Sequence, residues 1–167
     1  MKIFTKFNVT MSSPVHKIFG NQLRVRVCGI CIDRNKILLV NHSGLSHGDF
    51  WAPPGGGMKF GESAKVCLKR EFKEETGLNV KISDFLFAAE YIHEPLHAVE
   101  LFFLTTLIGG TLKKGEDPEM GAEQIIQEVR FFDWQEIDQL KSGERHGIFD
   151  KAQHASKIVD LRGYFKL

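Results

Sequence analysis

Residues 56–78 read GGMKFGESAKVCLKREFKEETGL, a glycine-rich loop that leads into a helical pattern. Ser63 is a favourable N-cap residue, and no Pro or Gly interrupts residues Ala64–Thr76. Gly77 is a common residue just past the end of a helix. These local signals predict a helix over Ala64–Thr76.

One face of this predicted helix changes from apolar to acidic. At about 100° per residue, Ala64, Cys67 and Leu68 share a face that should pack on a core. The same face continues through three carboxylates, at Glu71, Glu74 and Glu75. Like charges at this spacing repel, and partial burial increases the cost. A divalent cation would resolve the conflict, and carboxylate oxygens suit Mg²⁺ or Mn²⁺.

A solvated acidic face, paired with the neighbouring basic residues, is the alternative interpretation of the three glutamates. Two features favour the cation. The glutamates lie on the apolar side of the helix, and the loop just before it contains Gly55–Gly57. Glycines let the backbone approach an anion or a metal more closely than a side chain would permit.

The pattern Gly56-x5-Glu62-x7-Arg70-Glu71-Phe72-x-Glu74-Glu75-x-Gly77-Leu78 resembles the Nudix box of the Nudix hydrolases. Phe72 departs from the usual Leu, Ile or Val, and we interpret it as a packing variant. The resemblance implies an α/β class protein with the Nudix fold, an α/β/α sandwich around a central mixed β-sheet. It also implies metal-dependent hydrolysis of a diphosphate linkage in a nucleoside diphosphate joined to another group X.

The resemblance further implies a role for each residue of the box. Glu74 and Glu75 would be ligands of Mg²⁺ or Mn²⁺, and Glu71 would be a ligand or the base that activates water. Gly56 would offer its backbone carbonyl to the metal. Arg70 and Glu62 would support the site as an ion pair, in which the arginine forks onto the carboxylate and fixes its rotamer.

Candidates outside the box come from the rest of the chain. Members of this family often use a further acidic residue from the loop before the last strand, and of Glu119, Glu123 and Glu128 we choose Glu123. Arg26 and Lys59 are candidates for contact with phosphates, with solvated surface charges as the alternative.

Trp51 and His97 are also candidate substrate-binding residues. Trp51, like its neighbour Phe50, could stack on a base or pack in the core. His97, at the start of a predicted strand, could face a substrate or simply pack.

Periodicity predicts the order of the remaining elements. Strands are expected over residues 23–33, 37–40, 50–52, 80–92, 98–106 and 128–133, with helices over 134–140 and 150–161 and an acidic loop over 109–124. Residues 22–167 are predicted to form a single Nudix domain. Residues 1–21 are an N-terminal extension without an assigned structure, in which Phe4, Phe7 and Phe19 fit either an edge strand or a dimer contact.

Two motifs suggest other chemistry and are set aside. Cys28 and Cys31 form a C-x-x-C, but they lie in a predicted strand, where positions three apart point to opposite faces. His93-Glu94-Pro95-Leu96-His97 matches H-E-x-x-H, which binds zinc only when both histidines share one helical face. Pro95 and the strand-like residues that follow argue against such a helix.

Composition limits the partners. The 167 residues include 22 basic and 21 acidic side chains, which gives no electrostatic case for nucleic acid or a membrane surface. No run of 18 apolar residues and no secretory signal is found, so a cytoplasmic protein is expected. The expected partner is a small nucleotide-type substrate, and a homodimer is left open.

Two alternative functions use the same fold. A non-catalytic domain that senses a nucleotide would usually lose box carboxylates, whereas Glu71, Glu74 and Glu75 are all present. An enzyme of the isopentenyl diphosphate isomerase type would need a reactive cysteine in the site. The sequence therefore favours the hydrolase.

Overall fold

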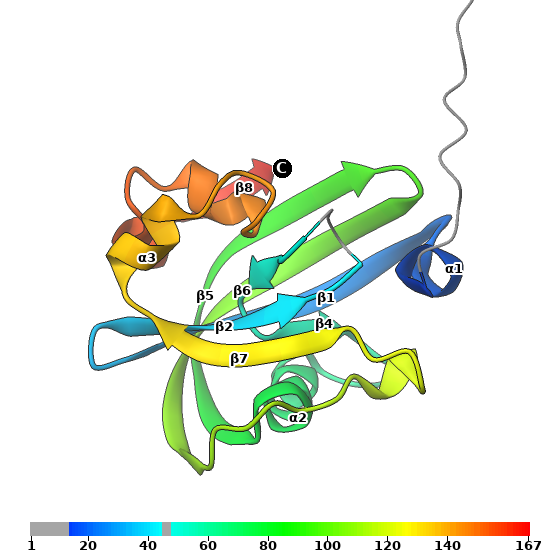
Figure 1. Ribbon diagram of the computed structural model, residues 1–167, viewed down its shortest axis with the longest axis horizontal. Helices are drawn as coiled ribbons and strands as arrows, with labels where there is room; N and C mark the ends of the chain where they lie inside the picture. Colours follow the sequence, from blue (N-terminus) through cyan, green and yellow to red (C-terminus); the bar gives the residue numbers. More distant parts are fainter. Residues whose placement is uncertain (1–13, 45–47) are drawn as a thin grey trace, which may run out of the picture.

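The computed structural model describes residues 14–44 and 48–167 (Figure 1). Phe4 and Phe7, which suggested an edge strand or a dimer contact, lie outside the described residues. In chain order the elements are α1 (Pro14–Phe19), β1 (Gln22–Asp33), β2 (Lys36–His42), β3 (Trp51–Ala52), β4 (Gly55–Gly57), α2 (Ala64–Thr76), β5 (Leu78–His93), β6 (Leu96–Gly110), η1 (Pro118–Met120), β7 (Ile126–Phe132), α3 (Trp134–Gln139), η2 (Gly147–Lys151), η3 (Ala155–Asp160) and β8 (Gly163–Lys166).

Strand β1 connects the two parts of an eight-stranded mixed sheet. Most of its length pairs in parallel with β6, and β4 pairs with it in antiparallel orientation. Its last residues pair with β2, which in turn pairs with β3 and β7. The long hairpin of β5 and β6 completes the sheet, with β8 at the outer edge of β5.

The sheet is covered on both faces (Figure 1). Helix α2 buries Cys67, Leu68 and Phe72 in one hydrophobic cluster with β1 and β5. Helix α3 and the C-terminal 3₁₀ turns bury Ile137, Ile148 and other apolar residues in a second cluster. The predicted α/β/α sandwich is therefore confirmed. Among the described residues, no helix has the length and apolarity needed to span a bilayer.

Helix α2 begins and ends where its sequence predicts. The Ser63 hydroxyl accepts a hydrogen bond from the Val66 N–H at 3.4 Å, and Gly77 adopts a left-handed φ of 71°. The C-x-x-C cysteines also follow their strand pattern. Cys28 lies in the cluster under α3 and Cys31 in the cluster under α2, so the two thiols point to opposite faces of the sheet.

The C-terminal region differs from the prediction of one helix over residues 150–161. Two short 3₁₀ helices, η2 and η3, form instead, and the unpredicted strand β8 follows them. Ala155 and Ile158, three residues apart, are both buried, and this spacing matches the three-residue turn of a 3₁₀ helix. Packing against the sheet thus selects the tighter turns.

The unusual Phe72 of the box packs on a glycine. A Cβ added to Gly29 would lie 2.4 Å from the Phe72 ring and 2.9 Å from the Thr105 methyl group. We expect Gly29→Ala to lower the free energy of unfolding by roughly 1–3 kcal/mol, because the fully buried ring has no room to move.

Urea unfolding of Gly29→Ala would measure this loss. Adding Phe72→Leu should restore part of the lost stability, since the smaller side chain makes space for the methyl group. Gly147→Ala is the control, because its Cβ would meet its nearest neighbour at 3.8 Å. Equal stability of Gly29→Ala and the wild-type protein would contradict the packing argument.

Candidate functional site

The glycine loop is packed directly against the box carboxylates. Gly55–Gly57 form β4, which pairs with Arg26, Val27 and Cys28 of β1. A Cβ on Gly56 would lie 2.4 Å from the Glu71 carboxyl carbon and 2.5 Å from each of its oxygens. Position 56 therefore has to be glycine if the Glu71 carboxylate is to stay where it is.

Two of the three helix glutamates are buried beside this loop. Glu71 and Glu75 are 6% and 4% exposed, while Glu74 is partly exposed. The Gly55 N–H donates to Glu75 Oε2 at 2.8 Å, and His42 Nε2 lies 3.5 Å from Glu75 Oε1. Both buried carboxylates therefore lie against the glycine loop.

Arg70 connects the carboxylates of the box. Its Nε and Nη2 donate to the two oxygens of Glu62 at 2.9 Å each, which is the predicted fork. Its Nη1 donates to Glu71 at 2.6 Å and to Glu74 at 2.9 Å. The Arg70 hydrogen bonds, against opposing desolvation, hold the pKa of Glu62 at about 2. One arginine thus fixes three carboxylates, a role that a lysine could not fill with the same geometry.

The Glu71 carboxyl resists ionisation. Burial, followed by the nearby charge of Glu75, raises its pKa from 4.5 to about 7, although Arg70 opposes the shift. This is the conflict between burial and like charge that a bound cation would relieve. No ready-made cluster of three or more His, Cys, Asp or Glu side chains suited to a metal exists among residues 14–44 and 48–167.

The donor set nevertheless fits a hard divalent cation. Glu71, Glu74 and Glu75 supply carboxylate oxygens, and the backbone of Gly56, whose carbonyl is the further predicted donor, lies against the Glu71 carboxylate. Such oxygen-only donors suit Mg²⁺ or Mn²⁺, which keep several waters or substrate oxygens as further ligands. These four residues are the ones that would hold the metal.

The pKa of Glu71 predicts how stability depends on pH in chelator-treated protein. The folded protein keeps the Glu71 proton up to about pH 7, whereas the unfolded chain releases it near pH 4.5. Between these values the folded state binds more protons, so stability falls as pH rises, by up to about 3 kcal/mol. Urea unfolding at pH 5 and pH 8 would measure the loss. Glu71→Gln should show a smaller loss, and identical pH profiles for the two proteins would contradict the assignment.

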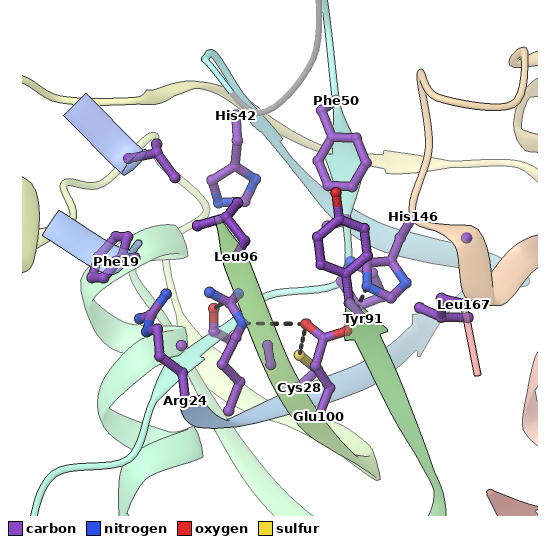
Figure 2. Close-up of a pocket in the computed structure, with 18 of the residues that line it drawn as sticks. Phe19, Arg24, Cys28, His42, Phe50, Tyr91, Leu96, Glu100, His146 and Leu167 are labelled. Carbon is purple, nitrogen blue, oxygen red and sulfur yellow. Dashed lines mark hydrogen bonds and ion pairs between the residues drawn. The ribbon is translucent and has the colours of Figure 1, made fainter. Parts of the chain in front are cut away.

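A cavity of about 450 Å³ opens beside these carboxylates (Figure 2). This volume lies within the range of sites that enclose small organic ligands. Figure 2 shows Phe19 at one end of it and His146 at the other, with Phe50 and Tyr91 along its side. The lining also includes Gly55, Gly56, Glu71 and Glu75, so the cavity and the box form one site.

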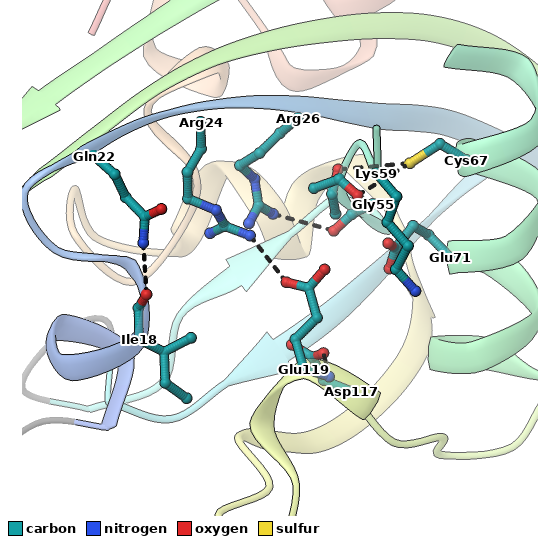
Figure 3. Close-up of polar contacts among 12 residues, drawn as sticks. Ile18, Gln22, Arg24, Arg26, Gly55, Lys59, Cys67, Glu71, Asp117 and Glu119 are labelled. Atoms are coloured by element: carbon teal, nitrogen blue, oxygen red, sulfur yellow. Dashed lines mark hydrogen bonds and ion pairs between the residues drawn. The ribbon is translucent and has the colours of Figure 1, made fainter. Parts of the chain in front are cut away.

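Two arginines of β1 lie on the cavity floor. Arg24 and Arg26 are two residues apart, so their side chains leave the same face of the strand. Each is paired with a carboxylate: Arg24 Nη2 with Glu119 Oε2 at 3.2 Å, and Arg26 Nε with Glu100 Oε1 at 3.2 Å. Burial and the neighbouring Arg26 lower the pKa of Arg24 to about 10, so it remains protonated at neutral pH. Figure 3 shows both guanidinium groups beside the glycine loop.

The other predicted site residues lie in different surroundings. Trp51 is buried in the core and packs edge-on against Phe132 at 4.6 Å, so the structure favours the packing alternative, whereas Phe50 lines the cavity. Lys59 is exposed on the loop after β4. His97 is at the cavity rim and pairs with Glu90 at 2.9 Å.

The acidic residue chosen from the loop before β7 is not the one that reaches the site. Glu123 is exposed and does not line the cavity, whereas Glu119 lines it and contacts Arg24. The short helix η1, with Met120 buried beneath it, turns Glu119 inward. The loop sequence alone carried no signal that distinguished these glutamates.

The H-E-x-x-H segment forms the turn of the β5–β6 hairpin. His93 is the last residue of β5 and pairs with Leu96, the first residue of β6. His93 and His97 therefore lie on different strands and not on a helix. This arrangement does not provide the helical zinc site that the motif would require.

Several residues of the cavity were missed from the sequence, among them Arg24, Tyr91, Glu100 and His146. Glu100 carried a usable signal, because it is a single charge within the apolar run Ala98–Phe102 of a predicted strand. A charge at such a position is rarely buried without a partner. The other three gave no comparable signal.

Comparison with known proteins identifies the family. A profile of the NUDIX domain matches residues 21–151, so the chain belongs to the Nudix family. An ADP-ribose pyrophosphatase of Methanocaldococcus jannaschii is 33% identical over 118 residues, which cover 70% of this chain and 65% of that protein. An 8-oxo-dGTP diphosphatase of Buchnera aphidicola is 33% identical over 91 residues, which cover 54% of this chain and 68% of its own length.

Solved structures show the same fold. A NUDIX hydrolase from Nitrosomonas europaea superimposes with a TM-score of 0.66 at 18% identity, covering 78% of this chain and 85% of that one. At this level of identity the likeness concerns the fold. It confirms the mixed sheet with helices on both faces.

Proposed function

We propose that the protein hydrolyses a diphosphate linkage in a nucleoside diphosphate joined to another group X, with Mg²⁺ or Mn²⁺ as cofactor. The observation that carries the proposal is the burial of Glu71 and Glu75 against the Gly55–Gly56 backbone, at the edge of a cavity with two arginines on its floor. The carboxylates suit a bound cation, and the arginines beside them suit the diphosphate of a substrate that binds together with that cation.

Each charged side chain of the site has a separate role in the proposed reaction. Arg24 and Arg26 bind the diphosphate from the cavity floor, and Arg70 keeps Glu62, Glu71 and Glu74 in place. Glu71 is either a ligand or the group that takes the proton of the attacking water, and a carboxyl with a pKa of about 7 suits that second role at neutral pH. The bound cation would neutralise the negative charge that develops on the diphosphate.

Among substrate classes, we place ADP-ribose-like compounds first. Of the two relatives described above, the one that matches 70% of this chain is named an ADP-ribose pyrophosphatase, and the one that matches 54% is named an 8-oxo-dGTP diphosphatase. The aromatic rings of Phe50 and Tyr91 give the cavity surfaces on which a base can stack. Nucleoside triphosphates and nucleotide sugars are the competing substrates. A cytoplasmic location stays a prediction.

Product release from a panel of substrates tests the proposal. The panel contains ADP-ribose, a nucleotide sugar and nucleoside triphosphates, each with Mg²⁺ and with Mn²⁺, and Glu74→Gln serves as the blank. We expect AMP and ribose phosphate from ADP-ribose and no release in the blank. If no substrate releases product but a nucleotide still raises the melting temperature, the protein would be a nucleotide-sensing domain and not a hydrolase.

A further inference from the structure

A buried carboxylate lies under the far part of the cavity, away from the box. Glu100 is 5% exposed, and the parallel register of β1 and β6 places it directly opposite Arg26. Its Oε1 lies 3.2 Å from Arg26 Nε, and its Oε2 lies 2.8 Å from His146 Nε2. Desolvation favours the neutral acid, but the His146 and Arg26 interactions outweigh it and hold the pKa of Glu100 at about 2.

His146 is held in one orientation by two hydrogen bonds and by contacts with two aromatic rings. The Ile148 N–H donates to His146 Nδ1 at 3.3 Å, so Nδ1 is an acceptor and Nε2 carries a ring proton. That nitrogen therefore donates to Glu100. The imidazole also packs at an angle against the rings of Phe50 and Phe102, with centroids 6.2 and 5.6 Å away. A histidine that is only 7% exposed thus bridges the C-terminal segment and the sheet.

Arg26 extends the connection to the box. Its Nη2 donates to the Gly55 carbonyl at 3.1 Å, one residue before Gly56 (Figure 3). The interactions therefore run without a break from His146 through Glu100 and Arg26 to the glycine loop. Arg24, the other arginine of β1 in the cavity, is held differently, because its partner Glu119 comes from η1 and has a side chain that is 29% exposed.

We propose that His146 is a positioning residue, which keeps Arg26 available for the diphosphate by sharing the charge of Glu100. This inference rests on the proposed function, in which Arg26 binds the substrate diphosphate. With His146 present, one Glu100 oxygen is taken by the imidazole and only the other reaches Arg26. Without that donor, both oxygens can turn to the guanidinium and form a forked pair. Arg26 would then have fewer N–H groups left for an anion.

Two substitutions separate this role from a structural one. His146→Gln keeps a donor at the place of Nε2 but loses the ring nitrogen that caps η2. His146→Asn keeps an acceptor near Nδ1 but no longer reaches Glu100. A structural role would make the two variants differ in melting temperature only. The positioning role makes them differ in diphosphate affinity.

The experiment measures the Kd of inorganic diphosphate by calorimetry and, with ADP-ribose, KM and kcat. We expect His146→Asn to raise both Kd and KM at least tenfold with kcat within threefold of wild type. His146→Gln should stay within threefold in all three constants. In an Arg26→Ala background, His146→Asn should change the Kd less than twofold, because it acts through the arginine.

Three outcomes would overturn the inference. They are an unchanged Kd in His146→Asn, a full tenfold effect that persists in Arg26→Ala, and a tenfold loss in His146→Gln. The last of these would overturn the inference even if His146→Asn does not fold. Failure of the proposed function would be recognised separately, because the wild-type protein would then turn over no substrate. The Kd values for inorganic diphosphate would still test the role of His146.

Discussion

Glu74→Gln should reduce metal-dependent turnover by at least about 1,000-fold and leave the fold intact. Glu74 is the least buried of the three helix glutamates, with a side chain 24% exposed, and it accepts one hydrogen bond from Arg70 at 2.9 Å. The amide oxygen of glutamine can accept the same bond, so the loss of stability should stay below about 1 kcal/mol. What the substitution removes is a negative charge at the place where the cation is proposed to bind.

Steady-state kinetics and thermal unfolding of the same preparation would test this prediction. Glu136→Gln is a matched control, because Glu136 also accepts a bond from an arginine at 2.9 Å but lies on α3. Glutamine can replace it in the capping box of that helix. The control should keep full activity. A large drop in melting temperature with activity retained in Glu74→Gln would show that Glu74 is structural.

The parts of the fold that the sequence predicted are those specified by neighbouring residues. Helix α2 has its cap at Ser63 and its end at Gly77, and both signals lie within the segment itself. The Arg70–Glu62 pair belongs to the same short region, eight residues apart. By contrast, η2, η3 and β8 depend on packing against the sheet, whereas the sequence of residues 150–161 favoured a single helix.

The cavity could not be predicted because it depends on pairing between distant strands. Arg26 meets Glu100 only because β1 and β6 run parallel in one particular register, and no local pattern specifies that register. The orientation of Phe50 and Trp51 could not be predicted from the sequence either. As neighbours at the start of a strand they point to opposite sides, so one of the two had to face the core, and the sequence did not show which.

Gly56→Ala is expected to lower turnover about 100-fold or more, for a reason that only the structure reveals. The new methyl group would lie 2.4–2.5 Å from the carboxyl atoms of Glu71, which is 6% exposed and has little space to retreat. The carboxylate would have to move by an ångström or more, and displacements of that size in an active site cost about two orders of magnitude in rate. The affinity for Mn²⁺, measured by calorimetry, should fall as well, because the same carboxylate is a proposed ligand.

Gly57→Ala is the comparison that makes the result specific. Its methyl group would meet the end of the flexible Arg24 side chain at 3.0 Å and the Glu119 carboxylate at an ordinary contact distance of 3.7 Å, so a loss of less than tenfold is expected. If Gly56→Ala and Gly57→Ala behave alike, the close approach of the Gly56 backbone to Glu71 has no functional meaning. If Gly56→Ala loses both turnover and Mn²⁺ affinity, the contact between loop and carboxylate is what assembles the site. Combining it with Glu71→Gln should then cost little beyond either single change, because both act on the same carboxylate.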